Sequence, residues 1–319
     1  MKKTLIIVMA AAVLCLMGAC QKEGVYNPKK KIANIYAEST STYAYYDGEQ
    51  WQEESYNEPK ALKERWTWDG NLLTKIETPY TSYIDEEEIT EYETTNFIYD
   101  GKQLIEANNG EEKMTFTYDG KKIDKAQVFE LDYSSTTPVE EVTFTYDGKK
   151  IVSLTLTELE SDGKAKAKTS RIMQMFTRSI FPDVQSFEKI ESAARQRASK
   201  SGSKGFSETI TLTWDGNNVS KIEANGISIE YTYDNMNNPY NGFIFSLFGE
   251  TAMGDDNFMT FGNENNCTKV VYKQGSYSQS MEYTYTYDGK WPVSCTSTNT
   301  YNEDEERSTY SRTTYLEYK

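Results

Sequence analysis

The stretch Thr143-Phe144-Thr145-Tyr146-Asp147-Gly148, followed by Lys149-Lys150-Ile151, decides the fold of this chain. Phe144 and Tyr146 alternate with threonines, which is the period of two that a half-buried strand requires. The glycine of the Asp-Gly pair accepts the positive φ that a tight turn needs. An apolar run after the turn completes the pattern, so the stretch predicts a β-hairpin.

This pattern recurs along the chain. We interpret the Asp-Gly pairs that end its copies as structural turns, because Asp hydrogen-bonds its own backbone and tolerates turn geometry. Tyr233-Asp234-Asn235 ends a further copy that lacks Gly. Units that repeat in this way cannot bury their apolar faces alone and must stack. The predicted turn residues are Asp69, Gly70, Asp100, Gly101, Asp119, Gly120, Asp147, Gly148, Asp215, Gly216, Asp288 and Gly289.

Most turns are followed by two apolar residues that stand three apart, such as Ile123 and Ala126. Residues at this spacing cannot share a face of a regular strand, so they predict a β-bulge, or a first residue that still belongs to the turn. One bulge per unit would curl a long sheet. The sequence therefore predicts an all-β fold, a curved antiparallel sheet in the form of a half-pipe or spiral shell, with one helical insertion.

The first twenty residues predict export. Lys2 and Lys3 precede an apolar stretch too short to span a bilayer, and Met17-Gly18-Ala19-Cys20 supplies small residues before a cysteine. This end resembles the lipobox of bacterial lipoproteins, which implies acylation of Cys20 with chains such as palmitate; an ordinary signal with a chance cysteine is the alternative. We expect a signal peptide at 1–19, an anchor linker at 20–31 and one domain at 32–319, with a basic insertion at 161–205.

Charge restricts the partners. Without Lys2 and Lys3 the chain holds 32 basic residues (34 − 2) against 49 acidic ones, a net charge of −17. This balance argues against nucleic acid, which rewards positive charge. We expect the N-terminal lipid to anchor the protein at the outer membrane, and the sequence leaves open whether it lies on the periplasmic or the cell-surface side. We expect an unknown protein or glycan as its ligand.

The sequence shows no catalytic constellation. The chain has no histidine, which excludes Ser-His-Asp and Cys-His arrangements and His-ligated metals. It has no glycine-rich phosphate loop and no cysteine pair at metal spacing. We expect no enzyme, no cofactor and no metal site. Paired carboxylates leave a glycoside hydrolase as a third alternative.

Two segments interrupt the repeats. Residues 160–206 hold ten Lys or Arg and five Asp or Glu, a net +5, and a stripe from Val184 to Ala194 predicts a helix from about Asp183 to Lys200. It either covers the acidic sheet or contacts a membrane or an acidic partner. Residues 237–266 are rich in Phe and Met, and they predict a plug over the sheet or a lined pocket. Cys267 and Cys295 fall at apolar positions, either free or bridged.

The motifs at Tyr99-Asp100-Gly101, Tyr118-Asp119-Gly120 and Tyr146-Asp147-Gly148 resemble those of the YD-repeat family, whose RHS-type members form β-sheet shells. Together with the lipobox and Tyr26 to Ile32, the chain is similar to uncharacterised YD-repeat-like surface lipoproteins of the Bacteroidota. The resemblance implies a fold and a location but no activity. We therefore expect a lipid-anchored binding or structural module of the cell envelope. The alternative is a ligand-binding protein that takes a glycan or lipid on an aromatic concave face.

Overall fold

The computed structural model describes residues 28–46, 48–84, 87–131, 137–159, 184–201, 207–241, 263–303 and 306–319. These residues form sixteen strands and a helix, α3 (Val184–Ser201). The strands are β1 (Ile32–Tyr46), β2 (Trp51–Asp69), β3 (Leu72–Ile84), β4 (Glu87–Asp100), β5 (Gln103–Asn108), β6 (Glu112–Asp119), β7 (Lys122–Glu130), β8 (Glu140–Asp147), β9 (Lys150–Glu158), β10 (Ser207–Asp215), β11 (Asn218–Ala224), β12 (Ile227–Tyr233), β13 (Cys267–Gln274), β14 (Tyr277–Asp288), β15 (Trp291–Glu303) and β16 (Glu306–Tyr318).

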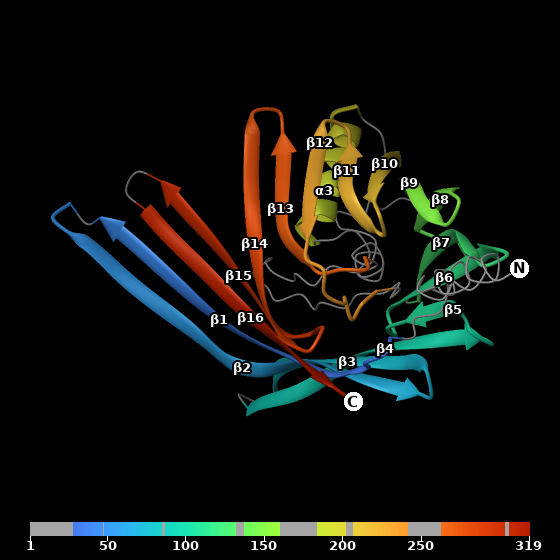
Figure 1. Ribbon diagram of the computed structural model, residues 1–319, viewed down its shortest axis with the longest axis horizontal. Coiled ribbons are helices and arrows are strands. Elements are labelled where there is room, and N and C mark those ends of the chain that lie inside the picture. The colour runs from blue at the N-terminus through green and yellow to red at the C-terminus, as the bar shows by residue number, and fades with distance from the viewer. Residues whose placement is uncertain are drawn as a thin grey trace, which may run out of the picture.

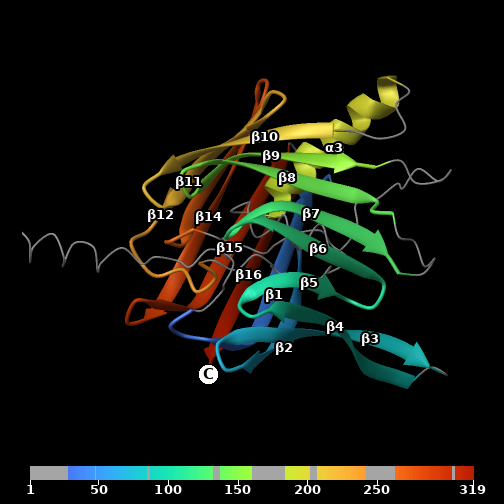
Figure 2. The same ribbon diagram turned by 90° about the vertical axis from the view of Figure 1, so that its right-hand side faces the viewer.

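The strands form a closed antiparallel barrel. Each strand pairs with its neighbours along the chain, and Figure 2 shows the succession from β3 to β10. The first and last strands also pair, from Ile32–Tyr318 to Tyr45–Glu306. The predicted half-pipe or spiral shell is therefore wrong, although the all-β class and the hairpin repeats are correct. Closure removes the two free edges that an open sheet would expose.

The closed barrel also corrects the resemblance to YD-repeat, RHS-like shells, because the Tyr-Asp-Gly units build a ring of strands and not an open curved sheet. The lipoprotein designation that accompanied this resemblance finds no support in the barrel. Cys20 lies outside the described residues, so its acylation stays a prediction.

All the Asp-Gly turns lie at one end of the barrel, which we call the turn end. Gly70, Gly101, Gly120, Gly148, Gly216 and Gly289 there adopt φ between 54° and 62°. The described chain begins at this end with Pro28 and finishes there with Lys319, which donates its backbone N–H to Lys31. We call the opposite end, where β1 ends and β2 begins, the distal end; β1, β2, β15 and β16 run to it as long ribbons (Figure 1).

A β-bulge follows each turn, which is one of the two interpretations that the spacing of the apolar residues allowed. On β7 the pairing passes from Tyr118–Ile123 to Thr117–Lys125, so Asp124 is the extra residue. The bulge turns Ile123 and Ala126 to the same side, where Ala126 is buried and Ile123 packs against the core. The same shift recurs after the other turns.

The carbonyl just before each extra residue accepts a hydrogen bond from an aromatic side chain of a neighbouring hairpin. Tyr118 Oη donates to Leu104 O and Tyr146 Oη to Ile123 O, at 2.6 and 2.9 Å. Such bonds link every odd-numbered strand to an even-numbered one, at 2.6–2.9 Å. The remaining pairs are Trp68–Ile32, Tyr99–Leu73, Trp214–Ile151, Tyr233–Val219, Tyr285–Cys267 and Tyr318–Pro292.

Around the core the inner wall of the barrel is mainly apolar and the outer wall is mainly polar. On β10, Ile210 and Leu212 are buried, whereas Thr209, Thr211 and Thr213 are exposed. Hydroxyl pairs and ion pairs cross the outer wall between strands, for example Thr155–Thr209, Thr157–Ser207, Lys269–Glu282 and Lys273–Glu230. Inward-facing apolar side chains thus form the core.

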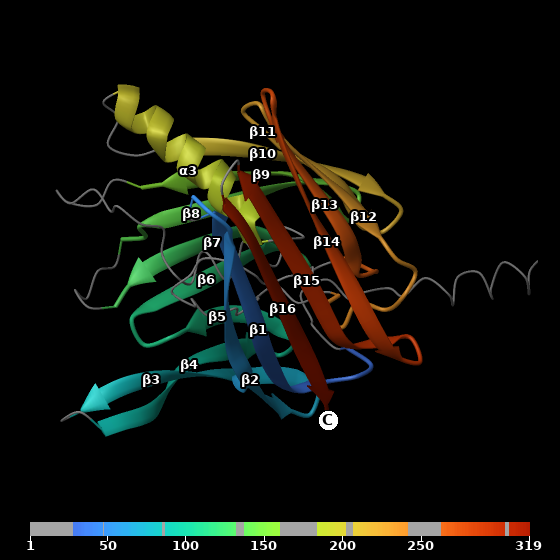
Figure 3. The ribbon, with the colours of Figure 1, turned by 90° about the vertical axis from the view of Figure 1, so that its left-hand side faces the viewer.

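Helix α3 packs inside this wall. It covers the predicted helix from about Asp183 to Lys200, shifted by one residue at each end, and lies beside β8 to β10 (Figure 3). Ile190 and Ala194 of the predicted stripe are buried. Among the described residues no helix is long and apolar enough to cross a membrane.

The turn end also holds the connection between β12 and β13. Asn238, Pro239 and Tyr240 are buried, and the Tyr240 ring meets Trp66 of β2 edge-on at 6.0 Å. This part of the connection therefore lies against the inner wall, as a plug would. Residues 242–262, which carry most of the predicted apolar cluster, lie outside the described residues.

Candidate ligand-binding surface

Large aromatic side chains stay exposed near the distal end of the barrel. Tyr56, Tyr277 and Tyr80 have exposed fractions of 64%, 56% and 49%. Alternation along each strand places these three on the inner wall, in phase with buried Trp66 and Ile76 once the bulges are counted. Tyr46, Trp51 and Tyr92 are exposed on the outer wall of the same end.

More inward tyrosines extend this surface. Tyr43 and Tyr45 of β1 stack at 5.7 Å between ring centroids, and Tyr277 meets Tyr272 edge-on at 6.0 Å. We call the inward set Tyr43, Tyr45, Tyr56, Tyr80 and Tyr277 the distal tyrosines. They come from β1, β2, β3 and β14, on the distal parts of these strands, beyond the points where β2–β3 pairing ends at Arg65–Glu77 and β14–β15 pairing ends at Glu282–Thr298.

Carboxylates stand beside two of these rings. Tyr56 Oη donates to Glu54 Oε2 at 2.8 Å. This hydrogen bond raises the pKa of Tyr56, and a hydrogen bond to Glu91 together with burial raises the pKa of Tyr80. Exposed rings with adjacent acceptors offer both an apolar face and strong hydrogen-bond acceptors to a ligand.

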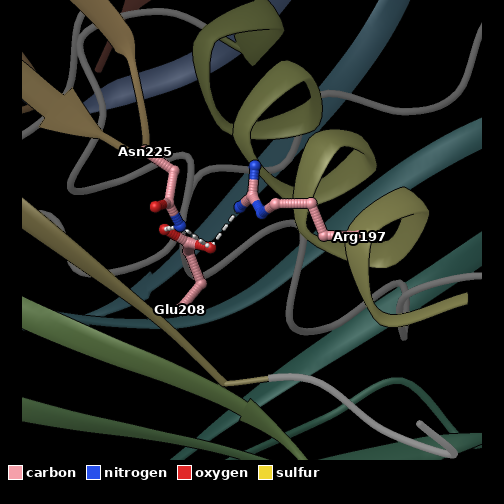
Figure 4. A network of polar contacts seen from close by, with 3 residues as sticks. All are labelled: Arg197, Glu208 and Asn225. Atoms are coloured by element: carbon pink, nitrogen blue, oxygen red, sulfur yellow. Dashed lines mark hydrogen bonds and ion pairs between the residues drawn. The ribbon is translucent and has the colours of Figure 1, made fainter. Parts of the chain in front are cut away.

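A second polar cluster lies where α3 meets the inner wall. Glu208 of β10 is 3% exposed, and its carboxylate accepts hydrogen bonds from Arg197 of α3 at 2.5 Å and from Asn225 at 2.6 Å (Figure 4). Arg195 pairs with Glu158 at 2.9 Å and with Glu140 at 3.6 Å. The basic helix therefore neutralises acids of the barrel interior.

These pairs separate the two interpretations of the insertion for its described part. Arg195 and Arg197 face acids of this same barrel, which agrees with a cover over the acidic sheet. The Lys-Ala-Lys-Ala-Lys segment at 164–168 lies outside the described residues. The buried carboxylates are held by guanidinium groups, an arrangement that serves packing better than proton transfer.

The predicted turn aspartates do not converge on a site. Asp69, Asp100, Asp119, Asp147, Asp215 and Asp288 are exposed in separate turns around the turn end. Asp288 forms an ion pair with Lys30 at 2.9 Å, which ties the start of the described chain to the turn end. The described residues contain no group of three His, Cys, Asp or Glu arranged to hold a metal ion.

Asp234, at the turn without Gly, has a different role. It accepts hydrogen bonds from Tyr287 Oη, from Met236 N and from Asn266 N. Asn263 Oδ1 accepts from Val219 N at 2.7 Å, which joins the same connection to β11. Asp234 thus clamps the β12–β13 connection to the turn end.

Cys267 and Cys295 are both buried and free, which settles the open disulfide question. Burial raises the pKa of the Cys295 thiol to about 12. A thiol with such a pKa stays protonated and unreactive at neutral pH, so it is a packing residue.

Sequence reasoning missed the distal tyrosines as a set. The available signal was local: Glu54, Tyr56 and Glu58 alternate on one face of β2, and Tyr43 and Tyr45 on one face of β1. What the sequence lacked was the strand order that places β14 and β1 to β4 in one barrel.

Comparison with known proteins adds a fold likeness only. No family model matches the chain, and no curated protein matches it. A porin-like protein from Bacteroides uniformis ATCC 8492 is 12% identical with a TM-score of 0.49, covering 88% of this chain and 97% of its own. A porin-like protein from Bacteroides vulgatus ATCC 8482 is 11% identical with a TM-score of 0.25, covering 91% and 99%. Both scores lie below 0.5, so neither likeness bears on function.

Proposed function

We propose that this chain is a water-facing barrel of the cell envelope, located at the outer membrane, that binds a glycan on its distal tyrosines. The single observation that carries the proposal is the exposure of three large aromatic side chains, Tyr56, Tyr80 and Tyr277, on the inward faces of their strands near the distal end. Inward aromatic rings nearer the turn end, such as those of Trp66, Phe97 and Phe116, are buried in the core.

The polar outer wall supports the water-facing part of the proposal. A membrane-spanning barrel carries an outward apolar band about 25 Å tall and a polar interior. The described strands have the reverse arrangement, with exposed threonines and ion pairs outside and apolar side chains inside. Such a wall would leave many polar groups unsolvated in lipid.

The chemistry of the distal tyrosines favours a glycan over a lipid. A sugar ring presents an apolar C–H face that stacks on an aromatic ring, and its hydroxyl groups donate to carboxylates. Glu54 and Glu91 stand next to Tyr56 and Tyr80 in a position to accept such bonds. A lipid tail has no hydroxyl groups to donate to these acids.

Affinity electrophoresis of the purified protein in gels containing soluble β-glucan, mannan or xylan tests the proposal. We expect at least one polysaccharide to retard migration, and Tyr56→Ala with Tyr80→Ala to abolish most of the retardation. Tyr92→Ala is the matched control, because Tyr92 is 43% exposed on the outer wall. Retardation that survives the inner double substitution, or no retardation by any of the polysaccharides, would contradict the proposal.

A further inference from the structure

A buried arginine lies inside the barrel without an ion-pair partner. Arg312 of β16 is 5% exposed, and its register neighbours are Ser39 on β1 and Ser297 on β15. Among the described residues its Nε atom has no hydrogen-bond acceptor, and no carboxylate forms an ion pair with it. A buried cation in this state is costly, because the interior supplies no water to solvate it.

A second cation stands close to it. Lys63 occupies the bulge of β2 opposite β1, between the residues that pair with Ile35 and Tyr36. Burial lowers the pKa of Lys63, and the charge of Arg312 lowers it further, whereas Glu58 acts in the opposite direction. Glu58 already accepts a hydrogen bond from Ser39 Oγ at 2.9 Å. Lys63 therefore lies within electrostatic reach of both the Arg312 guanidinium and the Glu58 carboxylate.

The groups around Arg312 are small and hydroxylated. Ser39, Ser297 and Thr314 are all buried, on the strands to either side and on β16 itself. A guanidinium offers a planar pair of donors that matches an oxyanion, and hydroxyl groups donate to the remaining oxygens. The combination is a donor-rich layer that suits an oxyanion.

We propose that Arg312 and Lys63 form an oxyanion site that takes the carboxylate or sulfate group of the bound ligand, so that the preferred glycan is an acidic one; this rests on the proposed function. The geometry supports the link. Ser39, opposite Arg312, precedes Tyr43 by four residues on the same face of β1, which corresponds to about 13 Å along the strand. One extended oligosaccharide spans that interval between the anion site and the distal tyrosines.

The first test uses sodium sulfate alone, at constant ionic strength against sodium chloride. We expect sulfate to raise the melting temperature of the wild-type protein by about 2 °C at roughly ten times its dissociation constant. Arg312→Leu should abolish this sulfate-specific rise without lowering the melting temperature in chloride, because it removes an uncompensated charge. Lys63→Met, at a half-buried position, should weaken the rise, and Lys269→Met on the outer wall should leave it unchanged.

Two results would overturn the inference: a wild-type protein that responds equally to sulfate and chloride, or an Arg312→Leu protein that keeps the sulfate-specific rise. If Arg312→Leu fails to fold, an undiminished sulfate response in Lys63→Met also overturns it.

The second test compares polygalacturonate with a neutral polysaccharide in the same gels. We expect stronger retardation by the acidic polymer in wild type and the loss of that preference in Arg312→Leu. Neutral retardation that depends on Tyr56 and Tyr80, with no preference for the acidic polymer, would refute the oxyanion site and leave the proposed function standing. A sulfate response without any glycan retardation would refute the proposed function and the acidic-glycan assignment together.

Discussion

In most repeats the aromatic residue before the turn Asp does two things at once. Its ring packs against the core, as that of Tyr118 does. Its hydroxyl or indole N–H donates a hydrogen bond to a backbone carbonyl that the bulge takes out of the strand pairing, as Tyr118 Oη does to Leu104 O. Tyr287, before Asp288, instead donates to the Asp234 carboxylate. A buried carbonyl without a donor costs free energy, so a bulge in every unit needs such a partner. This explains why the repeat carries Tyr or Trp there and not Phe.

Tyr118→Phe tests this role. The change keeps the ring and removes only the hydroxyl group, so we expect the free energy of unfolding in urea to fall by about 1 kcal/mol or more. Tyr92→Phe is the control, because Tyr92 is exposed and its ring faces Arg65 on the outer wall; it should change stability by less than about 0.5 kcal/mol. Equal effects of the two changes would show that the hydroxyl bond stabilises nothing.

Residue-scale features were predictable where they are local. Asp-Gly pairs predict turns because only nearby backbone is involved, and the spacing of Ile123 and Ala126 predicts a bulge because strand period is local too. The bond from Tyr146 to Ile123 joins different hairpins. No local signal reports it, so the structural importance of the hydroxyl group was not predictable.

At the scale of the element, α3 shows the same difference between local features, which the sequence predicts, and long-range contacts, which it does not. Its bounds follow from the Pro182-Asp183 start and its apolar stripe, and the structure places it within one residue of them. Its partners do not follow from the sequence, because Glu140 and Glu208 sit on strands where acids are ordinarily solvated. Only the closed barrel turns them inward, where they are buried and meet the arginines.

Arg197→Ala tests the contribution of this contact. The change removes the charged donor of the buried Glu208 carboxylate and leaves the Asn225 amide in place. We therefore expect the free energy of unfolding to fall by about 1–3 kcal/mol, towards the lower end because Arg197 itself is 44% exposed. Lys221→Ala is the control, since its pair with Glu223 is largely exposed and should contribute less than about 1 kcal/mol. A melt unchanged by Arg197→Ala would mean that α3 is not held to the wall through Glu208.

At the scale of the whole molecule, the closing of the sheet into a barrel was not predictable from the sequence. The last strand, β16, pairs with the first, β1, and this pairing joins Ile32 to Tyr318 across nearly the whole chain. Register between distant strands leaves no trace in hydrophobic alternation, which is the same for an open shell and a barrel. The candidate ligand surface was not predictable for that reason, since its tyrosines come from strands whose place in one barrel only the pairing shows.

The polar outer wall leads to the last prediction. If the wall faces water, the strands do not insert into a bilayer, and membrane association must depend on residues before Pro28. We therefore expect Cys20→Ala to move the protein from the membrane fraction to the wash, whereas Cys15→Ala, within the same signal, leaves it with the membranes. The measurement is fractionation of cells with a sodium carbonate wash, combined with labelling by a fatty-acid analogue. Cys20→Ala protein that resists the wash would show that the barrel itself enters the bilayer, against the arrangement of its outer threonines and ion pairs.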